Sequence, residues 1–127
     1  MPMVNAHDLK PEIWEAKYFS PSELQCKCCG RLNWTPESRE AIRALDALRA
    51  DLGVPIKVTS GFRCQDHNAA VGGATHSQHL KGVAFDLQPT RGATINPVLF
   101  QVRLIYLAEM YGFKGVGLYD KFLHSLS

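Results

Sequence analysis

The sequence has no long apolar run, no internal repeat and no low-complexity tract. None of its hydrophobic stretches reaches the roughly 20 residues that a helix needs to cross a bilayer, which excludes a transmembrane helix. The first residues, MPMVNAHDLKPEIW, lack the charged segment and apolar run of a secretory signal peptide. We therefore expect a soluble chain that is synthesised in the cytoplasm.

Strong charge bias is also missing. Fourteen lysines and arginines stand against twelve acidic residues, which gives a net charge of +2, and the basic residues are scattered singly. The absence of a dense basic stripe argues against a nucleic-acid partner. Hydrophobic residues make up 46% and charged residues 20% of the 127 positions, values ordinary for a soluble globular protein. This length fits a single domain with one core, and we expect a monomer.

Cysteine is scarce outside one short segment. Cys26, Cys28 and Cys29 lie together in CKCCG, and the fourth cysteine is Cys64. A four-thiolate zinc site usually draws on two well separated pairs, which this spacing of three plus one matches poorly. Small buried thiols, or one disulfide between the cluster and Cys64, fit better, and a second, structural metal ion is the alternative. The pattern leaves the redox state open.

Two segments carry the signals of helix starts. In SPSE, from Ser20, a hydroxyl cap is followed by proline and then by glutamate, which predicts a short helix running to the cysteines. In TPESREAIRALDALRADLG, Thr35 can cap, the next residue is proline, and leucines recur at helical spacing up to the stop at Gly53. Residues 1–17 show no periodicity, so we expect an N-terminal arm followed by a domain over 18–127.

The rest of the chain alternates strand and helix signals. PIKVTSG and GVAFDL are short apolar runs that predict strands, with a short helical segment in CQDHNAAVGG between them. NPVLFQVRLIYLAEMYG predicts a helix capped by Asn96 and ended by Gly112. GVGLY and FLHSL predict a hairpin with Asp120 and Lys121 at its tip. This order predicts an α+β domain with a small, mostly antiparallel sheet packed with helices.

The stretch SQHLKGVAFD places His79 and Asp86 on either side of a glycine. A charge in an apolar strand is costly unless it has a partner, and histidine and aspartate are both ligands of zinc. A catalytic zinc keeps three protein ligands and one open position, and either His76 or His124 could supply the third ligand. A histidine that is hydrogen-bonded to a carboxylate would have the same spacing, so the spacing alone leaves the site open.

Three segments taken together resemble one family. They are YFSPSELQCKCCG, VTSGFRCQDHNAAVGGATHSQHLKGVAFDL and GFKGVGLYDKFLHSL, and they occur in this order. They are similar to the zinc D-Ala-D-Ala carboxypeptidase family, which shares its fold with the zinc-binding signalling domain of hedgehog proteins. The motif S-x-H-x-x-G-x-A-x-D is specific because it fixes five residue types across ten positions. The resemblance implies a hedgehog/DD-peptidase-like fold.

The resemblance also implies roles for individual residues. It assigns His79, Asp86 and His124 as the ligands of one zinc ion. Arg63, in SGFR, matches an arginine that faces the substrate, and a guanidinium can bind a peptide carboxylate through two hydrogen bonds. Ser77 matches a serine that hydrogen-bonds the substrate. The alternatives without a functional role are a surface salt bridge for Arg63 and a turn-forming hydroxyl for Ser77.

The implied chemistry is hydrolysis of peptide bonds in bacterial peptidoglycan by a zinc-activated water, which needs a group to carry a proton. Relatives commonly place an acidic residue two positions after the last zinc histidine or a few before it. Here Leu126 follows at two positions and Lys121 precedes at three. Asp120 is the nearest carboxylate and our predicted base, and His76 is the other candidate because histidine can shuttle protons near neutral pH.

Two other classes of function compete with a peptidase. The first is a catalytically inactive zinc module that binds peptidoglycan or a protein partner, which the missing acidic residue near His124 would explain. The second is a structural domain in which the polar residues only satisfy one another. A peptidase made without a signal peptide would need release or delivery to reach the cell wall, for example through a phage lysis or tail function.

Overall fold

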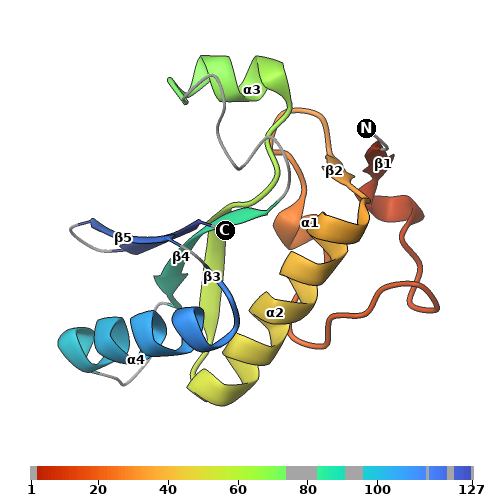
Figure 1. Ribbon diagram of the computed structural model, residues 1–127. Helices are drawn as coiled ribbons and strands as arrows, with labels where there is room; N and C mark the ends of the chain where they lie inside the picture. Colours follow the sequence, from red (N-terminus) through yellow and green to blue (C-terminus); the bar gives the residue numbers. More distant parts are fainter. Residues whose placement is uncertain (1–2, 74–82, 91–95, 114, 120–121, 127) are drawn as a thin grey trace.

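The computed structural model describes residues 3–73, 83–90, 96–113, 115–119 and 122–126, the last two ranges by their backbone alone. Their elements form an α+β fold, as predicted (Figure 1). The elements are β1 Met3–Asn5, a 3-10 helix Ala6–Asp8, α1 Pro21–Leu24, β2 Arg31–Asn33, α2 Pro36–Leu52, β3 Ile56–Ser60, α3 Gln65–Ala70, β4 Ala84–Pro89, α4 Pro97–Met110, β5 Gly115–Tyr119 and β6 Phe122–Leu126.

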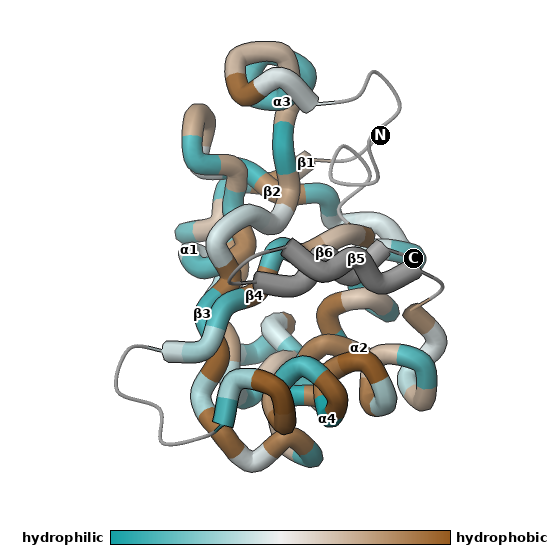
Figure 2. The backbone as a smooth tube through the Cα atoms, turned by 90° about the vertical axis from the view of Figure 1, so that its left-hand side faces the viewer, coloured by the Kyte–Doolittle hydropathy of each residue, from teal (hydrophilic) through white to brown (hydrophobic). Residues whose placement is uncertain are grey.

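The main sheet has four strands in the order β3-β4-β6-β5, and every neighbouring pair is antiparallel. The predicted hairpin is present, with Tyr119 of β5 opposite Phe122 of β6. The second sheet is the antiparallel pair β1-β2, which the sequence did not predict. Figure 2 shows α2 and α4 together on one side of the main sheet and α3 at the opposite end of the molecule. None of the described helices combines the length and apolar composition needed to cross a membrane.

Helix α2 begins and ends where its sequence predicts. The Thr35 hydroxyl accepts from the Ser38 N–H at 3.0 Å, the Ser38 hydroxyl accepts from the Thr35 N–H at 2.9 Å, and Gly53 ends the helix with φ of 75°. This reciprocal cap satisfies backbone donors that have no partner inside the helix. The apolar stripe of α2 is buried in the core at Ile42, Leu45, Leu48 and Leu52.

Helix α4 also has its predicted cap, because the Asn96 side chain accepts from two backbone N–H groups of the first turn. Its buried residues are Phe100, Leu104, Leu107 and Ala108, whereas Tyr106 and Met110 are exposed. The helix is apolar on most of its surface, so periodicity alone could not identify the side that faces the core.

The N-terminal segment packs on α2. The rings of Trp14 and Trp34 stack with their centroids 5.9 Å apart. The Glu15 carboxylate bonds the guanidinium groups of Arg39 at 2.8 Å and Arg43 at 3.3 Å. The hydrogen bond from Arg39, followed by the charge of Arg43, lowers the pKa of Glu15. These contacts fasten the segment to the outer surface of the helix.

Gly61 allows the end of β3 to lie against α1. A Cβ atom at this position would lie 2.7 Å from the Leu24 carbonyl oxygen, and the next N–H, that of Phe62, donates to the same oxygen at 3.1 Å. The Gly61→Ala substitution therefore has to displace backbone. We expect it to lower the free energy of unfolding by about 1–3 kcal/mol, measured by urea denaturation. The exposed Lys57→Ala on the same strand is the control, and equal losses in both variants would contradict the predicted clash.

Candidate active site

Asp86 lies at the centre of the main sheet. Its strand, β4, has β3 on one side and β6 on the other, and the register places Asp86 opposite Ser60 and opposite His124. The residue is buried, with 7% of its surface exposed. Of His124 the structure describes the backbone position alone. Two of the three predicted zinc ligands therefore stand opposite each other on neighbouring strands.

Arg63 joins Asp86 from the loop after β3. Its Nη2 lies 3.3 Å from Asp86 Oδ2, its Nε donates to the Ser60 hydroxyl at 3.1 Å, and its Nη1 donates to Asn68 Oδ1 at 3.5 Å. The side chains of Arg63 and Asp86 are only 14% and 9% exposed. The ion pair is therefore largely buried rather than on the surface, and it connects the predicted substrate-binding residue with a predicted metal ligand.

Four of the predicted site residues lie outside the described part of the chain. His76, Ser77 and His79 fall within residues 74–82, and Asp120 falls within residues 120–121. Their roles stay predictions from the sequence. Within the described residues the candidate site consists of Arg63, Asp86 and the backbone position of His124.

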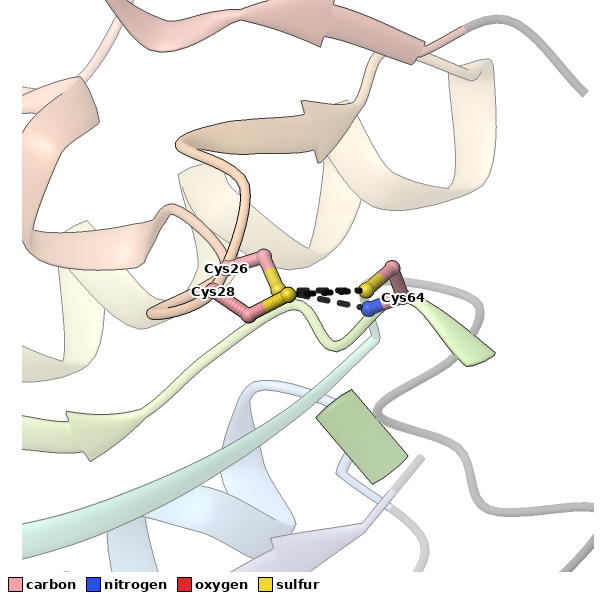
Figure 3. Close-up of side chains that lie close together, drawn as sticks. All are labelled: Cys26, Cys28 and Cys64. Atoms are coloured by element: carbon pink, nitrogen blue, oxygen red, sulfur yellow. Dashed lines mark hydrogen bonds between the residues drawn. The ribbon is translucent and has the colours of Figure 1, made fainter. Parts of the chain in front are cut away.

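Three of the four cysteine side chains converge next to this site. The Sγ atom of Cys64 lies 3.7 Å from that of Cys26 and 3.7 Å from that of Cys28 (Figure 3). All four cysteines are free thiols, and Cys26 is buried whereas Cys28 is exposed. The hydrogen bond with Cys64 is the main cause that raises the pKa of Cys28 to about 11. The spacing that matched a zinc site poorly thus brings three thiols together in the fold.

The family follows from a comparison with family models, in which a model described as Peptidase M15 matches residues 17–125. The chain belongs to the peptidase M15 family. A comparison with the curated proteins finds no match. The predicted family of zinc D-Ala-D-Ala carboxypeptidase-like proteins is thereby confirmed, and its members are zinc-dependent peptidases. The matched region of this M15 chain includes Arg63, Asp86, His124 and all four cysteines.

Sequence reasoning missed two residues that hold the Arg63 side chain in place. Ser60 and Asn68 both accept hydrogen bonds from Arg63, and Asn68 is 4% exposed. Ser60 is the first residue of SGFR and lies three positions before Arg63, so its closeness to Arg63 could have been inferred from the sequence. Nothing in the sequence around Asn68 distinguishes it from a surface asparagine, because its burial depends on how α3 packs.

Proposed function

We propose that this M15 chain is a zinc-dependent peptidase that hydrolyses peptide bonds of bacterial peptidoglycan, as a D-Ala-D-Ala carboxypeptidase or an endopeptidase. The observation that carries the proposal is the register of β4 and β6, which sets Asp86 opposite His124, together with the Arg63 guanidinium on the Asp86 carboxylate. These are the residues that the sequence motif assigned to zinc and substrate.

The position of Asp86 supports its proposed role as a zinc ligand. Residues directly opposite each other in an antiparallel pair have Cβ atoms about 4.5–5.5 Å apart, a separation that suits two ligands of one metal. Ligating carboxylates are usually hydrogen-bonded by a further residue, and here Arg63 binds one oxygen of Asp86. His79, Asp86 and His124 would hold the ion. When bound, zinc supplies a Lewis acid and a water with a pKa lowered to about 7.

Arg63 is suited to hold the substrate. A guanidinium has five N–H donors in a planar fork, and its contacts to Ser60, Asn68 and Asp86 use three of its nitrogens once each. Further donors on the fork can bind the carboxylate or carbonyl of a peptide, and the three contacts fix its orientation beforehand. Ser77 would add a hydrogen bond to the substrate.

The proton carrier is proposed from the sequence. Asp120 would accept a proton from the attacking water and pass it to the leaving amine, and His76 is the second candidate for this role. We further propose that residues 18–127 form the catalytic domain, that the chain acts as a monomer, and that lysis or a phage particle brings it to the cell wall.

The alternative, an inactive zinc module, is favoured by Leu126, which occupies a position where relatives commonly carry an acidic residue. Such a module would keep the zinc ion and bind peptidoglycan or a protein partner without turnover. Zinc content alone cannot separate the two functions, so the deciding measurement is product formation.

Digestion of purified peptidoglycan with the zinc-loaded chain tests the proposal. We expect mass spectrometry to show either released D-alanine, from a carboxypeptidase, or cleaved cross-links with new amino groups, from an endopeptidase. Removal of the metal by a chelator should abolish both products, and added zinc should restore them, because the ion activates the water. Zinc-loaded protein that binds peptidoglycan without forming any product would establish the inactive module instead.

A further inference from the structure

Three thiols form a second group of metal-ligating side chains outside the proposed catalytic site. The Sγ atoms of Cys26, Cys28 and Cys64 all lie within 4.8 Å of one another. Cys26 and Cys28 belong to the loop between α1 and β2, and Cys64 faces them from the segment that leads into α3 (Figure 3). The cluster thus connects two parts of the chain that are far apart in sequence.

The distances between the sulfur atoms suit a tetrahedral metal ion. Zinc–sulfur bonds of about 2.3 Å place neighbouring thiolates of a tetrahedral site about 3.8 Å apart. The two distances from Cys64, to Cys26 and to Cys28, are both 3.7 Å. Two of the three sulfur–sulfur distances therefore match those of a tetrahedral zinc site, and the third, between Cys26 and Cys28, is at most 4.8 Å.

Backbone hydrogen bonds within the α1–β2 loop hold Cys26 and Cys28 in position. The Cys26 N–H donates to the Arg31 carbonyl at 2.8 Å, and the Gly30 N–H donates to the Cys26 carbonyl at 2.9 Å. Gly30 has φ of 70°, a conformation that favours glycine and reverses the chain within a few residues. The tight loop brings both of its thiols to the same side, where Cys64 meets them.

Backbone donors also point at the sulfur atoms. The Cys64 N–H donates to Cys26 Sγ at 3.4 Å, and the His67 N–H donates to Cys64 Sγ at 3.4 Å. Hydrogen bonds of this kind orient metal-bound ligands and stabilise their negative charge. Two of the three sulfurs thus accept backbone hydrogen bonds, which would also support metal-bound thiolates.

The charge of the surroundings is complementary to such a site. Three thiolates around a divalent cation leave a net charge of −1. A hollow of about 490 Å³ beside the cluster is lined by Cys28 and Cys64, by Arg31 and Arg63, and by Asp66. Arg63 is already paired with Asp86, so the positive charge that can balance a negative thiolate–metal group is that of Arg31.

We propose that Cys26, Cys28 and Cys64 bind a divalent zinc ion that is separate from the catalytic one, with water at the fourth position. Cys28 is exposed, so solvent reaches the ion, and Cys29 instead contacts Arg31, whose pKa this contact raises. Because Cys64 directly follows Arg63, the ion fastens the substrate-binding arginine to the α1–β2 loop. The proposal does not depend on peptidase activity.

Cobalt substitution tests the thiolate site directly. Protein prepared under reducing conditions and loaded with Co²⁺ should show the intense near-ultraviolet charge-transfer absorption of thiolate–cobalt bonds. We expect the band in the unmodified chain and in His79→Ala, in which the proposed catalytic site is disabled. The Cys28→Ser and Cys64→Ser variants should lose the band and one bound zinc per chain, and Cys29→Ser, the matched control, should keep both.

Several outcomes would overturn the proposal. Without any charge-transfer band in the reduced, unmodified chain, the thiols bind no metal, and this result does not depend on whether the variants fold. If the band persists in Cys28→Ser and Cys64→Ser, or disappears in Cys29→Ser, the three assigned ligands are wrong. If the chain isolated without reductant lacks metal and is lighter by a pair of hydrogens, the cluster is a disulfide. If the charge-transfer band is missing but peptidoglycan is still hydrolysed, the cysteine zinc site is wrong and the proposed peptidase function is unaffected.

Discussion

The Asp86→Ala variant should lose one zinc ion per chain and hydrolyse peptidoglycan at least about 1,000-fold more slowly in kcat/KM. This factor corresponds to about 4 kcal/mol, within the several kcal/mol that a metal ion contributes to the transition state of hydrolysis. Asp86 is buried in the inner strand β4 opposite His124, so its removal takes away a ligand that lies inside the sheet. Metal analysis and product analysis on the same preparation measure both effects.

The same substitution should also destabilise the fold. Removal of Asp86 leaves the Arg63 guanidinium, whose side chain is 14% exposed, without its carboxylate partner. Removal of one partner of a buried ion pair typically lowers the free energy of unfolding by about 3–5 kcal/mol. Asp86→Asn separates the two effects, because it keeps a hydrogen-bond acceptor for Arg63 but is a poor zinc ligand. We expect it to lose zinc and activity at a smaller cost in stability.

Asp66→Ala is the matched control, since this aspartate is exposed at the start of α3. It should keep zinc, activity and the urea midpoint of the unmodified chain. Undiminished zinc and turnover in Asp86→Ala would show that the carboxylate only pairs with Arg63, and the proposed ligand set would then be wrong.

The Arg63→Lys variant should keep the catalytic zinc but lose about 10- to 100-fold in kcat/KM. A hydrogen bond to a charged group contributes about 1.5–3 kcal/mol, and a lysine ammonium cannot reproduce a planar fork that also bonds Ser60 and Asn68. The loss should fall mainly on KM if Arg63 binds the substrate carboxylate, and mainly on kcat if it polarises the carbonyl in the transition state. Steady-state kinetics on a defined muropeptide measure kcat and KM separately.

Arg43→Lys is the control, because this exposed arginine of α2 contacts Glu15 of the N-terminal segment and lies outside the site. Equal kcat/KM in Arg63→Lys and the unmodified chain would mean that Arg63 has only a structural role. Loss of zinc together with activity in Arg63→Lys would instead indicate that the arginine acts by positioning Asp86.

The elements that could be predicted are those whose caps and apolar patterns lie within one short segment of the sequence. The cap at Thr35 and the buried leucines of α2 lie within one segment, and Asp86 was conspicuous because a charge in an apolar strand needs a partner. The β1-β2 pair was not predictable, since each strand has three residues and shows no clear alternation. Local patterns identify elements and a hairpin between neighbouring strands such as β5 and β6, but they do not identify which distant elements pair.

The missed contacts depend on registers and packing between distant segments. Ser60 lies opposite Asp86 because an irregularity between Val58 and Ser60 shifts the pairing of β3 with β4, and such a shift has no reliable sequence signal. The approach of Cys64 to Cys26, by contrast, was one of the sequence expectations, as a disulfide, and in the fold it accompanies the close approach of β3 to α1 at Gly61. The ligand assignment at His79 and His124 came from a family motif, which carries information on distant positions that spacing lacks.

The place of β6 in the sheet affects the order in which the site assembles. This strand is the last element of the described chain, but it lies inside the sheet, between β4 and β5. Its hairpin with β5 is local and should form within microseconds, whereas docking onto β4 joins Asp86 to a residue far along the chain and should be slower. We therefore expect the pairing of Asp86 with His124 to be a late folding event. Uptake of zinc at the catalytic site would then serve as a kinetic probe of the final folding step.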